Sequence, residues 1–150
     1  MDQQNYNACI TANISPKEAF EGISHVSEWW ATNFEGRAKN LNDVFTVRFG
    51  ETFVTFKIVE MVTNKKIVWQ VIDCHLPWLD DKSEWKGTKI AWETSTENNL
   101  TQISMTHIGL VPEIECYTDC EKGWNFYVKE SLAKLLTEHK GLPDTSKNSR

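Results

Sequence analysis

Three kinds of segment are missing from this chain of 150 residues, and each absence narrows its function. Lys and Arg number only 16 against 21 Asp and Glu and form no basic stripe, which argues against nucleic acid as a partner. No stretch approaches the roughly 20 apolar residues that a membrane helix needs, and the first residues do not resemble a signal peptide. We therefore expect a cytoplasmic protein without a membrane span.

Catalytic and metal-binding motifs are also missing. The sequence contains no Gly-rich phosphate loop, no Gly-x-Ser-x-Gly elbow and no His-Glu-x-x-His pair. Its four cysteines include no Cys-x-x-Cys pair, and free thiols are the default in a reducing compartment. Cys116 and Cys120 could share a helical face near His107, but buried small hydrophobes are the stronger interpretation. We expect no metal, no cofactor and no catalytic residue.

Large aromatic side chains are abundant instead, with seven Trp and seven Phe. Such rings contribute much buried area, and they also line cavities for flat or apolar ligands. A chain of this length buries roughly two-thirds of its unfolded surface around one core. We expect a single domain over residues 1–141, followed by a polar, flexible tail over 142–150.

The first 30 residues predict a strand followed by helix. Residues 6–14 alternate between apolar and polar side chains, the period of a strand with one buried face. Ser15 and Glu18 then form a capping-box pattern, and Pro16 suits a first helical position. Apolar residues continue at helical spacing to about Trp30, as one helix or two short ones.

The rest of the chain predicts an antiparallel meander and one long helix. Strand patterns separated by turn residues cover 44–49, 53–61, 67–72, 89–94 and 100–108. An amphipathic helix follows over about 118–140, with Gly141 as its stop. The order predicts the α+β class and a helix-grip fold: a curved antiparallel sheet of about six strands wrapped on the C-terminal helix, with two short helices after the first strand.

Three motifs in this order resemble the SRPBCC superfamily of birch-pollen-allergen-like and START-like domains. They are ISPKEAF at 14–20 followed by Trp29-Trp30, the late strand ending in Thr106-His107-Ile108-Gly109, and Gly123-Trp124 in the long helix. The branch that the chain resembles most contains stand-alone proteins similar to the activator of heat-shock-protein-90 ATPase. The resemblance covers about residues 6–141, and it implies a helix-grip fold with a hydrophobic cavity but no particular reaction.

Strand parity then gives the residues expected to face the helix and line that cavity. For any single aromatic ring, a plain core position is as good an interpretation as a cavity wall. The ligand-binding candidates are Trp30, Trp69, Val71, Ile90, Trp92, Ile103, Met105, His107, Trp124 and Val128.

These patterns leave three functions open. The leading hypothesis is binding of a small apolar, aromatic or lipid-like molecule between sheet and C-terminal helix, without catalysis. One alternative is a module that binds a chaperone through its surface, for which the Pro77-Trp78-Leu79 stretch is a candidate. Another is a cyclase- or hydrolase-type enzyme with His107 as acid or base, although a core histidine bonded to a backbone carbonyl is the favoured interpretation. We expect a monomer or homodimer, with Trp78 as a candidate dimer contact.

Overall fold

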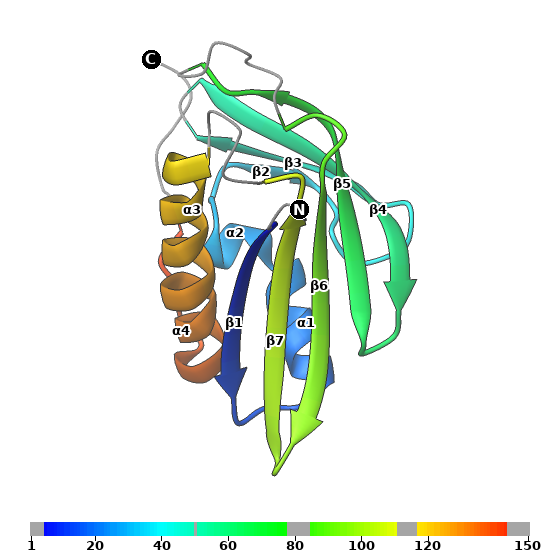
Figure 1. Ribbon diagram of the computed structural model, residues 1–150, viewed down its shortest axis with the longest axis vertical. Helices are drawn as coiled ribbons and strands as arrows, with labels where there is room; N and C mark the ends of the chain where they lie inside the picture. Colours follow the sequence, from blue (N-terminus) through cyan, green and yellow to red (C-terminus); the bar gives the residue numbers. More distant parts are fainter. Residues whose placement is uncertain (1–4, 50, 78–84, 111–116, 144–150) are drawn as a thin grey trace, which may run out of the picture.

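Alternating buried and exposed side chains build one antiparallel sheet in the computed structural model, which describes residues 5–49, 51–77, 85–110 and 117–143. The strand order is β1-β7-β6-β5-β4-β3-β2, and every neighbouring pair of strands is antiparallel (Figure 1). The strands are β1 (Tyr6–Ala12), β2 (Phe34–Gly36), β3 (Val44–Phe49), β4 (Thr52–Val62), β5 (Lys66–His75), β6 (Lys89–Glu97) and β7 (Leu100–Ile108). The predicted helix-grip architecture is confirmed, with β2 as a seventh strand.

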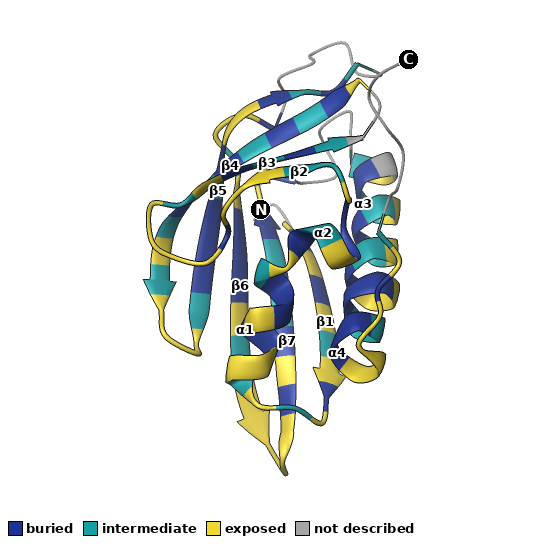
Figure 2. Cartoon of the chain, turned by 180° about the vertical axis from the view of Figure 1, so that it is seen from behind, coloured by how far each residue is buried: buried dark blue, intermediate teal, exposed yellow. Residues whose placement is uncertain are grey.

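Two short helices follow β1, as the sequence predicts. Helix α1 (Pro16–Ser24) starts with a complete capping box. The Glu18 N–H donates to the Ser15 hydroxyl at 3.1 Å, and the Ser15 N–H donates to the Glu18 carboxylate at 3.0 Å. Helix α2 (Val26–Trp29) begins directly after His25. Both helices cover the concave side of the sheet in Figure 2.

The C-terminal helix consists of three consecutive parts that run beside β1 in Figure 1. They are α3 (Tyr117–Phe126), the π-helical turn η1 (Tyr127–Leu132) and α4 (Ala133–Glu138). Trp124, Val128 and Leu132 form a buried stripe with a spacing of four residues. Such a stripe drifts by about 40° per step around an ideal α-helix. The wider π turn counteracts this drift and keeps the stripe directed inward.

The chain after this helix folds back onto α2. His139, in a left-handed conformation, ends the helix. The Ser131 hydroxyl donates to the Trp29 carbonyl at 2.6 Å and accepts the Leu142 N–H at 2.6 Å. One buried hydroxyl therefore ties η1, α2 and the C-terminal segment together. The predicted tail 142–150 thus begins with an anchored residue, and residues 144–150 lie outside the described residues.

The core lies between the concave face of the sheet and the three helical segments. Figure 2 shows buried residues on the facing sides of the strands and helices, while the tips of the β6–β7 hairpin are exposed. Among the described residues, the largest side chains in this core are the fully buried Trp29, Trp69 and Trp92. No described helix is both long and apolar enough to cross a membrane.

Candidate functional site

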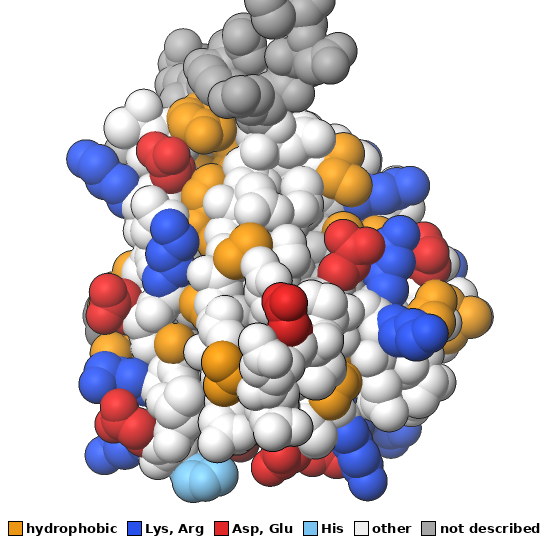
Figure 3. All heavy atoms as spheres, turned by 60° about the horizontal axis from the view of Figure 1, so that its bottom comes forward, with side chains coloured by type: hydrophobic (Ala, Val, Ile, Leu, Met, Phe, Trp, Pro, Cys, Tyr) orange, Lys and Arg blue, Asp and Glu red, His pale blue; other side chains and the backbone are white. Residues whose placement is uncertain are grey.

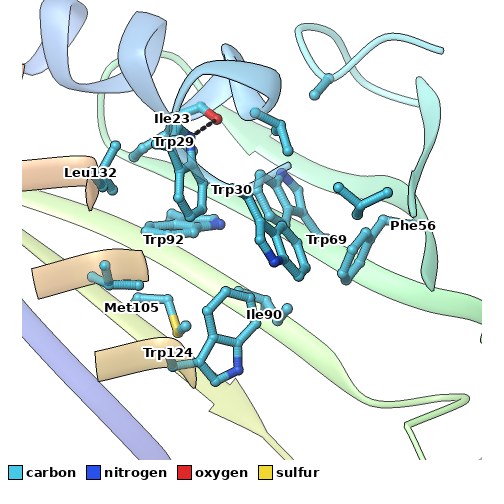
Figure 4. Packing of buried hydrophobic residues seen from close by; sticks show 14 of the residues in the cluster. Ile23, Trp29, Trp30, Phe56, Trp69, Ile90, Trp92, Met105, Trp124 and Leu132 are labelled. Atoms are coloured by element: carbon cyan, nitrogen blue, oxygen red, sulfur yellow. Dashed lines mark hydrogen bonds between the residues drawn. The ribbon is translucent and has the colours of Figure 1, made fainter. Parts of the chain in front are cut away.

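A connected network of aromatic rings lies between the sheet and the helices (Figure 4). From the sheet, Trp69 contacts Phe45 and Phe56 with ring centroids at 4.9 and 5.3 Å, and it contacts Trp92 at 5.3 Å. Trp92 meets Trp29 of α2 edge to face at 5.7 Å. The arrangement of sheet rings against helix rings follows from the inward parity of β4, β5 and β6.

The network continues to the end of the molecule where the C-terminal helix begins. Trp29 stacks on Trp30 at 6.0 Å, and Trp30 contacts Trp124 of α3 at 4.9 Å. Trp124 in turn lies parallel to Trp85, with centroids 5.9 Å apart and planes 12° apart. Residues from α2, α3 and the segment before β6 therefore meet at one end of the core.

All ten residues selected from the sequence are buried on the inner side of the fold. Trp30, Trp69, Trp92, His107 and Trp124 belong to the connected ring network. The other members add aliphatic or thioether surface to the same core; they are Val71, Ile90, Ile103, Met105 and Val128. That these residues line a ligand cavity stays a prediction.

His107 is held by hydrogen bonds at both ring nitrogens. The Trp124 indole N–H can only donate, so the His107 Nδ1 at 3.1 Å is the acceptor and the ring proton resides on Nε2. Nε2 then donates to the Thr88 hydroxyl at 2.9 Å, which itself donates to the Trp85 carbonyl at 2.7 Å. The chain of donors and acceptors is complete for a neutral histidine.

Burial also keeps His107 neutral. The side chain is fully buried, and Trp85 lies edge to face against its ring at 4.6 Å. Removal from water disfavours the charged imidazolium, which lowers the pKa of His107 to about 3. A proton added at Nδ1 would also face the Trp124 N–H. The geometry is that of a buried, hydrogen-bonded histidine, but the partners are the side chains of Thr88 and Trp124 and not the expected backbone carbonyl.

Three other buried indoles have no hydrogen-bond acceptor. Within the described part of the chain, the Nε1 atoms of Trp69, Trp85 and Trp92 are buried and unpaired. By contrast, the Trp29 N–H donates to the Ile23 carbonyl at 3.1 Å and the Trp124 N–H to His107. Buried polar groups in folded proteins are nearly always paired, so three unpaired donors in one cluster require an explanation.

Sequence reasoning missed two residues of this site. Trp85 and Thr88 lie in the connection before β6, where no strand or helix period marks them. A turn at Gly87, which has a φ of +92°, brings both next to His107. The only available signal was the Trp85-Lys86-Gly87-Thr88 turn itself. Pro77 is half-buried, while Trp78 and Leu79 lie outside the described residues.

The cysteines only partly follow the expectation of free thiols. Cys120 is disulfide-bonded, so that expectation is wrong for this residue. Cys9 and Cys74 are reduced, the first exposed and the second buried. Cys116 lies outside the described residues. No group of three or more His, Cys, Asp or Glu side chains with metal-binding geometry occurs in the described ranges.

Charged and apolar side chains are mixed on the face of the molecule shown in Figure 3. There, charged side chains of both signs are interspersed, and hydrophobic side chains lie in small separate areas. The most exposed large hydrophobic residues, among them Val44, Val62 and Phe126, come from different strands and helices. Single apolar residues of this kind are normal on a protein surface.

Several solved structures share the fold of this chain. The solution structure of the Aha1 dimer from Colwellia psychrerythraea is similar with a TM-score of 0.73 and 22% identity, over 91% of this chain and 98% of that one. DynU16, a putative protein in the dynemicin biosynthetic locus, has a TM-score of 0.67 and 12% identity, over 93% of this chain and 49% of that one. CalU16 from Micromonospora echinospora has a TM-score of 0.62 and 8% identity, over 87% and 73% of the two chains.

At the level of sequence, no protein-family model matches the chain, and no curated protein is significantly similar to it. The structural matches show that the chain has the fold of the Aha1 structure.

Proposed function

We propose that this protein binds a flat, largely apolar molecule with hydrogen-bond acceptor oxygens in its interior, between the sheet and the C-terminal helix. The observation that carries the proposal is the set of three buried indole N–H groups of Trp69, Trp85 and Trp92 without an acceptor. A ligand carbonyl or hydroxyl oxygen is the partner that such donors lack.

The energetics support a guest molecule at this place. A buried donor without a partner costs about 1–3 kcal/mol, because its hydrogen bond to water is lost and not replaced. The combined cost of three such donors in the same aromatic cluster is a substantial fraction of the free energy of unfolding of a small domain. A ligand that accepts from one or more of them recovers part of this free energy on binding.

The aromatic network favours a flat ligand body. Rings from β5, β6, α2 and α3 present both faces and edges toward the interior, and aromatic groups stack or pack edge to face on such surfaces. A few polar groups set in a mostly apolar wall is the usual composition of a small-molecule site. Binding, without catalysis, is the function that these features support.

The two alternatives receive less support. A chaperone-related role rests on the fold shared with Aha1, and the residues that the sequence singled out for it, Trp78 and Leu79, are outside the described ranges. An enzyme that uses His107 would need a nitrogen free for proton transfer. Both nitrogens are hydrogen-bonded within the protein, and burial lowers the pKa of His107 to about 3.

A matched pair of probes tests the proposal. 9-Fluorenone and fluorene have the same tricyclic frame, but only fluorenone carries a carbonyl oxygen. We expect both to raise the melting temperature and fluorenone to bind about tenfold more tightly, since one hydrogen bond to a buried donor is worth about 1.4 kcal/mol. Isothermal titration calorimetry and thermal shift measure the two affinities.

Tryptophan variants locate the effect. The single variants Trp69→Phe, Trp85→Phe and Trp92→Phe each keep a ring but remove one unpaired N–H, so the preference for fluorenone should shrink to about twofold in the variant that loses the donor to the carbonyl. Trp29→Phe is the control, because its N–H is already paired with the Ile23 carbonyl and the preference should persist. If neither compound binds, the proposal of an interior ligand is wrong. Equal binding of both compounds to the unmodified protein would refute the role of the indole donors.

A further inference from the structure

Three adjoining hollows lie beside α1 on the outside of the molecule, away from the aromatic interior. The central hollow, of about 600 Å³, lies between α1 and the tip of the β4–β5 hairpin. A second hollow of about 510 Å³ adjoins it at Val62 and Asn64, and a third of about 300 Å³ adjoins it at Ser24, His25, Lys39 and Asn40. We refer to these three adjoining hollows as the α1 groove.

The charge of the α1 groove is opposite to that of the whole chain. Five cationic side chains line it: Lys17, Arg37, Lys39, Lys65 and Lys66. Only two acidic side chains do so, although the chain carries a formal net charge of −5. Of the five cations, Lys66 pairs with Glu60 at 3.5 Å, and the other four form no ion pair within the described ranges.

The floor of the α1 groove is apolar. Phe20 of α1 and Ile67 of β5 are buried beneath it, and Met61 of β4 is half-buried at its side. The groove thus combines unpaired cations at its rim with hydrophobic side chains at its base. A partner that fits has negative charges along its length and at least one hydrophobic side chain.

The length of the α1 groove favours an extended segment over a small molecule. Helix α1 has nine residues and is about 13 Å long, which corresponds to about four residues of extended chain. The second hollow reaches Pro16 at the start of the helix, and the third continues past its end to Ser27 and Arg37. An extended segment of about six or more residues would therefore contact all three hollows along its length.

We propose that the α1 groove binds an extended acidic segment of another protein, with its charges on the lysines and arginine at the rim and a hydrophobic side chain on the Phe20–Ile67 floor. This inference is independent of the interior ligand. Charge complementarity on an otherwise acidic protein gives the groove its selectivity, because acidic segments are repelled elsewhere.

Fluorescence anisotropy with a labelled peptide of sequence DELDEFDE tests the proposal. We expect saturable binding that weakens as salt is raised, since exposed charges are screened within about 10 Å at 0.1 M ionic strength. The double variant Lys17→Glu with Lys39→Glu should bind at least about tenfold more weakly at low salt, because two attractive contacts become repulsive. The matched control is Lys122→Glu with Lys129→Glu, two exposed positions on the C-terminal helix that change the net charge equally.

Each outcome of these measurements either supports or refutes the α1 groove as a binding site for an acidic segment. Weakening by the α1 groove variant but not by the control supports the site, and equal weakening by both shows general charge attraction and overturns it. A peptide with serine in place of its leucine and phenylalanine should bind clearly more weakly, and equal binding would contradict the role of the apolar floor. Tighter binding of a single-stranded oligonucleotide than of the peptide would assign the groove to nucleic acid, and absence of any peptide binding would refute the proposal.

Discussion

Acidification from pH 7 to pH 4 should lower the free energy of unfolding by about 3 kcal/mol through His107 alone. Burial lowers the folded-state pKa of His107 to about 3, whereas an unfolded histidine has its ordinary value near 6.5. Between these two values the unfolded chain binds a proton that the folded chain does not. Stability is therefore complete above about pH 6.5 and is lost progressively as the pH falls toward 3.

Urea unfolding at several pH values measures this effect. Carboxylates also titrate over the range, so the comparison is with His107→Asn, whose side-chain oxygen can still accept the Trp124 N–H but does not titrate. The difference in pH slope between the two proteins isolates His107. Should the variant fail to fold, nitrogen chemical shifts of the His107 ring provide a second readout, and a ring already charged at pH 5 would contradict the structure.

Gly141→Ala should destabilise the protein by about 2–4 kcal/mol. A Cβ atom at this position would lie 2.4 Å from the Glu28 carbonyl oxygen, 3.1 Å from the Trp29 Cα and 3.1 Å from the Ser131 carbonyl oxygen. All three are backbone atoms, which cannot rotate away as a flexible side chain can. The methyl group would push the C-terminal segment off α2, and the hydrogen bond from Leu142 to Ser131 would be lost with it.

Gly123→Ala is the matched control for this prediction. Gly123 is inside α3, and apart from its two chain neighbours and the nearby backbone of its own helix no described heavy atom lies within 4 Å of a Cβ built there. Alanine is better than glycine in a helix, so this substitution should stabilise the protein by about 0.5–1 kcal/mol. In urea unfolding, we expect the free energy of unfolding to fall for Gly141→Ala and to rise for Gly123→Ala. An unchanged free energy of unfolding for Gly141→Ala would show that the C-terminal segment is not held against α2.

The regular elements could be predicted from the sequence because each has a strong local signal. Alternation over residues 100–108 correctly placed Ile103, Met105 and His107 on the buried side of β7. The Ser15–Glu18 capping box is likewise a local pattern, and its hydrogen bonds are confirmed. Local patterns of this kind were sufficient to predict the helix-grip fold.

Features that depend on contacts between distant segments could not be predicted. Strand β2 has only three residues, too few to establish an alternating pattern. Gly141 was interpreted as the stop of the C-terminal helix, but His139 ends that helix and Gly141 permits a close approach to α2. The tautomer of His107 follows from its contacts with Trp124 and Thr88, which are distant in sequence and come together only in the fold.

The unpaired indoles illustrate the same limit at the candidate site. Composition shows that tryptophan is abundant, and alternation along the strands predicts that Trp69 and Trp92 point into the core, where both are buried. Neither signal distinguishes an indole N–H with an acceptor, as in Trp29, from one without. That distinction depends on the position of single backbone carbonyls, which strand and helix periods do not specify.

The π turn also determines where the C-terminal helix can vary in length. Deleting one residue from an ordinary α turn rotates everything after it by about 100°, which would turn Leu135 and Leu136 away from the core. In η1 the Ala133 N–H donates to the Val128 carbonyl, five residues earlier, so this turn holds one residue more than an α turn. A deletion within residues 127–132 can therefore be absorbed by conversion to α-helix, with the inward stripes on both sides retained. Relatives of this fold with a helix one residue shorter at this point would have a continuous α-helix.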